Sequence, residues 1–187
     1  ALVLVPVVVA MLLAAGARPA HLAALSALGL AFAPLVWFFG MGRAQQGRIL
    51  AFIAPQADPY GMGWHIRQSL AAVASGQVTG EGFSSGAPVL LNRGFAAYTD
   101  FIFAVIAHEW GFLGCMAVIL LLFLLFTRGT EIAAATREPF GRLVVVGVLA
   151  MLAFQALVNI GMTIRLCPIT GLTLPFVSYG GSSLLTC

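Results

Sequence analysis

Asp100 is the residue of this chain best placed to do chemistry, because it stands directly before the long apolar run 101–126. A carboxylate where a membrane helix leaves water is costly in free energy unless it has a function or a partner. In the first turn of the predicted helix, the helix dipole favours its ionised form. Asp100 is therefore a candidate base for chemistry on a lipid-borne substrate at the membrane surface. An N-terminal cap is an equally weighted alternative, since Asp is a preferred capping residue.

Small residues continue from Asp100 along one face of the predicted helix. They recur at spacings of four and three, and they are Ala104, Ala107, Gly111 and Gly114. Such a stripe allows close packing against another helix, so we expect Asp100 to face protein or a cavity. Glu109 and His108 lie within the same apolar run. For Glu109 a buried polar network and a function stay equally open, whereas a polar network is favoured for His108.

Two arginines, Arg48 and Arg93, flank a long polar segment and are candidates for substrate binding. The planar fork of an arginine matches phosphate oxygens, so either side chain could hold a pyrophosphate group. Ion pairs with Asp58 or Glu81 explain the arginines equally well.

A second polar pattern lies in the apolar run near the end of the chain, where Gln155, Asn159 and Thr163 are spaced four apart on one helical face. This face could line a polar cavity, although hydrogen bonding between helices is the more common reason for such a pattern. The three cysteines, Cys115, Cys167 and Cys187, show no metal-ligand spacing and do not suggest a disulfide framework.

The elements that must position these residues are membrane helices. The chain has 187 residues, of which 61% are hydrophobic and only 8% charged, and its mean hydropathy is +1.04. Soluble domains carry about 25% charged residues. The composition therefore predicts an all-α polytopic membrane protein. All nine basic residues are arginine and they are dispersed, which argues against a nucleic-acid partner.

Hydropathy predicts about four spans and the start of a fifth within a single membrane domain, 1–187. The predicted membrane helices are 1–16, 22–40, 98–126, 143–164 and 181–187. Between the second and third lies a long polar segment, 41–97, in which 64–74 could form a short interfacial helix. Apolar runs at both termini predict that the chain is a fragment of a longer protein.

The arginines also predict the topology. Arg18 lies in the turn after the first span, and Arg128, Arg137 and Arg142 lie between the third and fourth spans. The excess of arginine in short cytoplasmic loops places these two connections inside the cell. The segment 41–97 and Asp100 then face the extracytoplasmic side.

Several motifs in order identify the chain as similar to the SEDS family of FtsW, RodA and SpoVE, over essentially all of its length. They are Asp58-Pro59 with Gly61 and Gly63, Gln68-Ser69, Thr99-Asp100-Phe101-Ile102-Phe103-Ala104 with Glu109 and Gly111, Asn159-Ile160-Gly161-Met162, Pro168-Ile169-Thr170-Gly171, and Leu174-Pro175-Phe176-Val177-Ser178-Tyr179-Gly180-Gly181-Ser182-Ser183. The resemblance leans toward the RodA branch. It implies a ten-span fold, of which this chain would hold the sixth to ninth spans and the start of the tenth.

The resemblance also implies a function, the polymerisation of lipid II by a peptidoglycan glycosyltransferase of the bacterial inner (cytoplasmic) membrane. Asp100 would be the catalytic general base. The residues implied in substrate binding are Arg48, Arg93, Gln68, Ser69, Ser178 and Tyr179. A divalent cation, Mg²⁺ or Mn²⁺, could assist at the pyrophosphate, and the usual partner is a class B penicillin-binding protein.

The chain departs from the usual family pattern at a few positions. Phe95-Ala96-Ala97-Tyr98 stands where Pro-Glu and a His are common, Arg165 replaces a Gly, and His108 replaces a Glu. Two further functions stay open at this point. One is a lipid II transporter, with Glu109 and the face of Gln155, Asn159 and Thr163 along its route. The other is a scaffold for a penicillin-binding protein without chemistry of its own.

Overall fold

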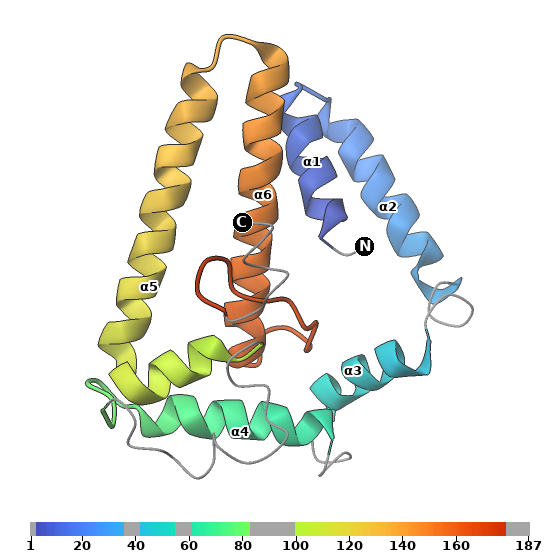
Figure 1. The fold of residues 1–187 in the computed structure, drawn as a ribbon. Helices are drawn as coiled ribbons and strands as arrows, with labels where there is room; N and C mark the ends of the chain where they lie inside the picture. Colours follow the sequence, from blue (N-terminus) through green and yellow to red (C-terminus); the bar gives the residue numbers. More distant parts are fainter. Residues whose placement is uncertain (1–2, 36–41, 55–60, 83–99, 179–187) are drawn as a thin grey trace. The chain divides into compact units, whose positions relative to one another are not determined.

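The computed structural model describes residues 3–35, 42–54, 61–82 and 100–178. These residues form helices joined by turns and irregular segments, with no strand among them, which confirms the predicted all-α class for this part of the chain (Figure 1). In order, the helices are α1 (Leu4–Ala14), α2 (Pro19–Leu35), α3 (Arg43–Ile53), α4 (Met62–Ser75), α5 (Ile102–Ala135) and α6 (Pro139–Thr163).

Two of these helices, α5 and α6, are long and apolar enough to cross a membrane. Each contains an 18-residue stretch of mean hydropathy 2.4. At 1.5 Å per residue, about 20 helical residues cross the apolar core of a bilayer. Both helices extend into the predicted loop 127–142, so that only 136–138 separates them. The limits of the membrane spans stay a prediction, because a helix can continue beyond the bilayer.

The polar segment 41–97 contains two helices where it is described. α4 lies where the sequence predicts a short helix at 64–74, whereas α3 was not predicted. The predicted fifth span, 181–187, lies outside the described residues.

The chain divides into two compact units, and the first comprises 1–46 and 124–154. Within it α1 packs on the first half of α6. A methyl group on Gly147 would lie 3.1 Å from the sulfur of Met11, and the Arg142 guanidinium donates a hydrogen bond to the carbonyl oxygen of Ala14 at 3.2 Å. Glycine therefore allows the close approach of these two helices.

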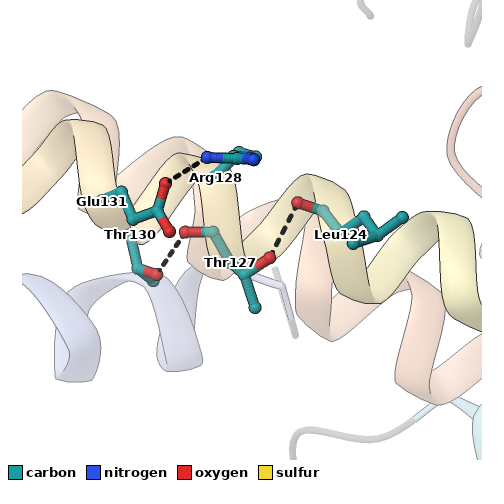
Figure 2. A network of polar contacts seen from close by, with 5 residues as sticks. All are labelled: Leu124, Thr127, Arg128, Thr130 and Glu131. Carbon is teal, nitrogen blue, oxygen red and sulfur yellow. Dashed lines mark hydrogen bonds and ion pairs between the residues drawn. The ribbon is translucent and has the colours of Figure 1, made fainter.

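Polar contacts mark the end of α5 in this unit, where its apolar run stops (Figure 2). The hydroxyls of Thr127 and Thr130 donate to the carbonyl oxygens of Leu124 and Thr127, at 2.9 and 2.8 Å. Arg128 and Glu131 form an exposed ion pair at 3.0 Å. Exposed pairs of this kind contribute at most about 1 kcal/mol to stability.

The second unit comprises 47–123 and 155–187, and it holds the core that positions Asp100. In this core α4 packs against the start of α5 and against the segment that follows α6. The buried residues of the core are Ile66, Ala72, Phe101, Ala104, Val105 and Ile169. Ala104 is completely buried, so the small-residue face predicted next to Asp100 does face protein.

A break in α5 at Gly111 interrupts the helical spacing of the small-residue stripe. Gly111 has φ 64° and ψ −157°, a conformation that is essentially restricted to glycine. The break frees backbone groups, and the segment 76–82 pairs with them. The four bonds run from Phe112 N–H to Gln77 O (3.0 Å), Leu113 N–H to Val78 O (3.2 Å), Glu81 N–H to His108 O (3.0 Å) and Gly82 N–H to Glu109 O (3.1 Å).

Candidate functional site

Asp100 lies before α5 and not in its first turn. The carbonyl oxygen of Phe101 accepts hydrogen bonds from the backbone of Ala104 and Val105, at 3.0 and 3.3 Å, which makes Phe101 the N-cap residue. The carboxylate of Asp100 has no hydrogen-bond or ion-pair partner among the residues that the structure describes. The capping alternative is therefore not supported, and the carboxylate is left available to a ligand.

Asn159, on α6, fixes the backbone at Asp100. Its side-chain amide nitrogen donates one hydrogen bond to the carbonyl oxygen of Asp100 at 2.9 Å. It donates a second to the carbonyl oxygen of Leu172 at 2.7 Å. Asn159 is completely buried. One amide group thus joins the segment before α5 to the segment after α6.

The side chain of Arg48, on α3, lies close to the Asp100 carboxylate. Its guanidinium donates a hydrogen bond through Nη1 to the carbonyl oxygen of Thr170 at 2.9 Å. A methyl group on Gly171 would lie 3.7 Å from Oδ2 of Asp100 and 4.0 Å from Nη1 of Arg48. The carboxylate and the guanidinium thus flank Gly171, which has φ 71° and no side chain to fill the space between them.

Among the buried polar atoms that lack a hydrogen-bond partner in the described part of the chain, two belong to the residues joined by the Arg48–Thr170 hydrogen bond. They are Nε of Arg48 and the hydroxyl oxygen of Thr170. Buried polar groups in proteins are nearly always paired, so each unpaired atom calls for an explanation. A ligand bound between Asp100 and Arg48 could satisfy both, since it would bring phosphate and hydroxyl oxygens to this space.

The other predicted substrate-binding residues take different positions. Ser69 is completely buried in α4, and its hydroxyl donates to the carbonyl oxygen of Thr163 at 3.0 Å. The Ser178 hydroxyl accepts a hydrogen bond from the backbone N–H of Leu174 at 2.7 Å and closes a turn. Gln68 lies half-buried in α4. Arg93 and Tyr179 lie outside the described residues, and contact with substrate stays a prediction for all five.

His108 belongs to a buried polar network, as its sequence context favoured. It is 3% exposed, its Nδ1 lies 2.7 Å from the Ser75 hydroxyl, and its Nε2 lies 3.7 Å from Glu81. Glu81 therefore faces His108, and the alternative in which it pairs with Arg48 is not what the structure has. Glu109 lies beside Trp110 in a groove of about 530 Å³ on α5.

Two of the three polar residues predicted on one face of α6, Asn159 and Thr163, are buried and hydrogen-bonded. The Thr163 hydroxyl donates to the carbonyl oxygen of Asn159 at 2.9 Å, and both residues are completely buried. The Asn159 amide thus bonds outside α6, whereas the Thr163 hydroxyl bonds within the helix, and among the described residues neither side chain forms a hydrogen bond between two helices. The sequence marked Asn159 as unusual, but nothing in the sequence identified Asp100 and Leu172 as the partners of its amide.

Comparison with known proteins assigns the family. A family model described as "Cell cycle protein", which covers FtsW, RodA and SpoVE, matches residues 1–187. The chain belongs to the FtsW/RodA/SpoVE family. This confirms the resemblance that the sequence motifs indicated.

Curated members of the FtsW/RodA/SpoVE family are similar over most of this chain. The peptidoglycan glycosyltransferase MrdB of Escherichia coli K12 is 42% identical over 155 residues, which cover 83% of this chain and 42% of MrdB. The probable peptidoglycan glycosyltransferase FtsW of Trichlorobacter lovleyi is 40% identical and covers 99% of this chain and 48% of that protein. Stage V sporulation protein E of Bacillus subtilis is 40% identical, and the match covers 97% of this chain and 49% of that protein. The chain thus spans about half the length of these relatives.

A solved structure of a family relative also has this fold. It is described as "Structural coordination of polymerization and crosslinking by a peptidoglycan synthase complex". The match has a TM-score of 0.78 and 34% sequence identity, and it covers 98% of this chain and 50% of the other. Sequence and fold therefore agree on the FtsW/RodA/SpoVE family.

Proposed function

We propose that the protein is a peptidoglycan glycosyltransferase that polymerises lipid II, with Asp100 as general base. The observation that carries this proposal is the unpaired carboxylate of Asp100 beside Arg48, across the side-chain-free position of Gly171. Curated relatives at about 40% identity are named for the same activity. The proposed site also lies on the predicted extracytoplasmic side, where lipid II sugars are exposed for polymerisation.

The proposed reaction forms one glycosidic bond and breaks one bond to pyrophosphate. The 4-hydroxyl of the acceptor sugar gives its proton to the Asp100 carboxylate while its oxygen attacks the anomeric carbon of the donor. The bond from that carbon to the pyrophosphate oxygen breaks, and undecaprenyl pyrophosphate leaves with the electron pair. An ionised carboxylate without a competing hydrogen bond suits the role of base.

Arg48 is the proposed contact for the pyrophosphate. Its Nη1 already bonds to the Thr170 carbonyl, so the guanidinium is fixed in place while its buried Nε stays free to donate. Arginine forks suit phosphate oxygens, and the Thr170 hydroxyl could add a further donor. A divalent cation, Mg²⁺ or Mn²⁺, would find one carboxylate here, and no cluster of three or more acidic, His or Cys side chains occurs in the described part of the chain. Mg²⁺ commonly completes such a site with substrate phosphates and water, so a cation fits only together with the substrate.

The wider setting follows from the family and is part of the proposal. It comprises a ten-span fold in the bacterial inner membrane and a class B penicillin-binding protein as partner. The relative described as part of a peptidoglycan synthase complex supports such an assembly. Of the two branches of wall synthesis, the RodA-like motifs favour elongation.

The decisive test is polymerisation of lipid II by the whole purified protein, comparing wild type with Asp100→Ala. We expect the variant to lose at least about 100-fold in rate, because general-base catalysis contributes roughly 10²–10⁴-fold. Glu131→Ala removes an exposed carboxylate at the other end of α5 and serves as the matched control. Equal glycan product from wild type and Asp100→Ala would refute the role of Asp100. Lipid II translocation in vesicles that depends on Glu109 and not on Asp100 would instead favour the transporter.

A further inference from the structure

Asn159 makes contacts that a simple helix-packing residue does not need. Its amide nitrogen has two N–H groups, and both donate to backbone carbonyls outside α6, one at Asp100 and one at Leu172. These two acceptors belong to the two segments that carry the proposed site. Leu172 directly follows Gly171, the residue flanked by the Asp100 carboxylate and the Arg48 guanidinium.

We propose that Asn159 is a positioning residue that sets the place of the Asp100 carboxylate relative to Arg48. The proposal rests on the glycosyltransferase function proposed above. Its physical basis is that the backbone of Asp100 and the backbone of Leu172 are both hydrogen-bonded to the same buried amide group. Asn159 has no exposed surface, and its amide nitrogen is bonded to both segments.

The chemistry of the amide explains why this position holds asparagine. An ionised aspartate here would have no donor and would place negative charge against two carbonyl oxygens. Leucine has a similar volume but would leave both carbonyls without this donor, which costs more than the loss of a solvent-exposed hydrogen bond. Serine offers one donor on a shorter side chain. Only a primary amide supplies two N–H groups at this reach.

A buried anchor also holds Asn159 itself. The Ser69 hydroxyl bonds to the Thr163 carbonyl, and the Thr163 hydroxyl bonds to the Asn159 carbonyl. All three side chains are completely buried. The C-terminal part of α6 is thus joined to α4 on one side and to the two site segments on the other. Of these hydrogen bonds, only those of the Asn159 amide reach the backbone of Asp100 and Leu172 directly.

The test compares wild type, Asn159→Leu and Asn159→Ser in the lipid II polymerisation assay on the whole protein. We expect kcat to fall by about 10- to 100-fold, since displacement of a catalytic group by about 1 Å can cost 10²-fold. We expect KM for lipid II to change by less than about threefold, because Arg48 and Thr170 remain bonded to each other. Asn159→Ser is the milder change and keeps the test valid if Asn159→Leu does not fold.

Ser75→Ala is the matched control, because it removes a hydroxyl of the same unit that bonds to the Ala72 carbonyl and to His108, without touching Asp100, Asn159 or Leu172. It should leave kcat within about threefold of wild type. If folded Asn159 variants retain wild-type kcat, or if Ser75→Ala lowers kcat as much as they do, Asn159 has no positioning role.

A second measurement does not depend on activity. Deuterium uptake by the backbone of 168–178 should rise in Asn159→Leu and stay unchanged in Ser75→Ala. Unchanged uptake in both variants would overturn the geometric basis of the proposal. If the variants show this pattern of uptake but the wild-type protein does not polymerise lipid II, the proposed function is refuted. The role of Asn159 in fixing the backbone then still stands.

Discussion

Asp100 lies one residue before the N-cap position of α5, where the backbone carbonyl of Phe101 accepts the first hydrogen bonds of the helix. The sequence left two alternatives for Asp100, an N-cap and a base. The N-cap position is taken by Phe101, so the cap does not explain Asp100. Because the carboxylate is not used to cap the helix, its oxygens stay available to accept a proton from a substrate.

At Arg48, the geometry of the side chain gives a testable difference between arginine and lysine. In Arg48→Lys one ammonium group would have to replace both the bond to the Thr170 carbonyl and the free Nε donor. We expect the Kd for undecaprenyl pyrophosphate to rise about tenfold, which corresponds to about 1.4 kcal/mol. Binding is measured in an Asp100→Ala background, where turnover does not interfere.

Arg128→Lys is the control for this substitution, because Arg128 forms only an exposed ion pair with Glu131 (Figure 2). Its Kd should match that of the Asp100→Ala protein. Equal Kd values for Arg48→Lys and Arg128→Lys would show that Arg48 does not contact the pyrophosphate.

Residue types in the sequence identified the two charged groups of the candidate site, but not how it is assembled. Asp100 and Arg48 stood out because charge is rare in this chain. Ser69 and Ser178 came from the same family motifs, yet their hydroxyls bond to the protein backbone. A hydroxyl that binds substrate and one that closes a turn look alike in a sequence, because only tertiary contacts distinguish them.

Among the elements, the break in α5 is the feature most sensitive to a single methyl group. In Gly111→Ala the new methyl would lie 2.6 Å from the Val78 carbonyl oxygen and would meet the backbone nitrogen of Gly80 as well. The backbone conformation of Gly111 is also strained for any other residue. We expect a loss of roughly 2 to 5 kcal/mol in stability, measured as a lower midpoint of thermal unfolding in detergent.

Gly47→Ala provides the contrast, because Gly47 lies inside α3 and a methyl group there would meet nothing within 4 Å. Alanine is the better helix former, so this variant should gain roughly 0.5 to 1 kcal/mol. If Gly111→Ala unfolds at the same temperature as wild type, α5 does not break at this residue.

The long apolar runs of α5 and α6 are visible in the hydropathy of the sequence. Hydropathy gives no sign of structure that depends on backbone pairing. The segment 76–82 bonds to the open backbone of α5, and no motif or periodicity in its sequence predicts this pairing. Gly111 looked like one of several small residues on a helical face. The interruption arises from the close approach of Gly80, which no periodicity in the sequence reveals.

Considered as a whole, the chain exposes apolar side chains on a scale that suits lipid. Along α5, Leu120, Leu121 and Phe123 are all exposed, with Leu121 at 66%. Soluble monomers rarely expose large contiguous apolar patches. In a bilayer such side chains need no further cover, so the exposed surface agrees with the membrane location expected from the composition and the family.

The positions of the arginines predict which side of the membrane each connection faces, and cysteine labelling tests this prediction. Gln45, in α3, and Glu138, between α5 and α6, are both exposed. In a cysteine-free background, Gln45→Cys should react with a membrane-impermeant maleimide on intact spheroplasts, because the segment 41–97 is predicted to lie outside. Glu138→Cys should react only after the membrane is opened, since arginines concentrate in the cytoplasmic connection. The cysteine-free protein gives the background signal. Labelling of Glu138→Cys but not Gln45→Cys in intact spheroplasts would invert the topology and place Asp100 on the cytoplasmic side, away from the sugars that it is proposed to join.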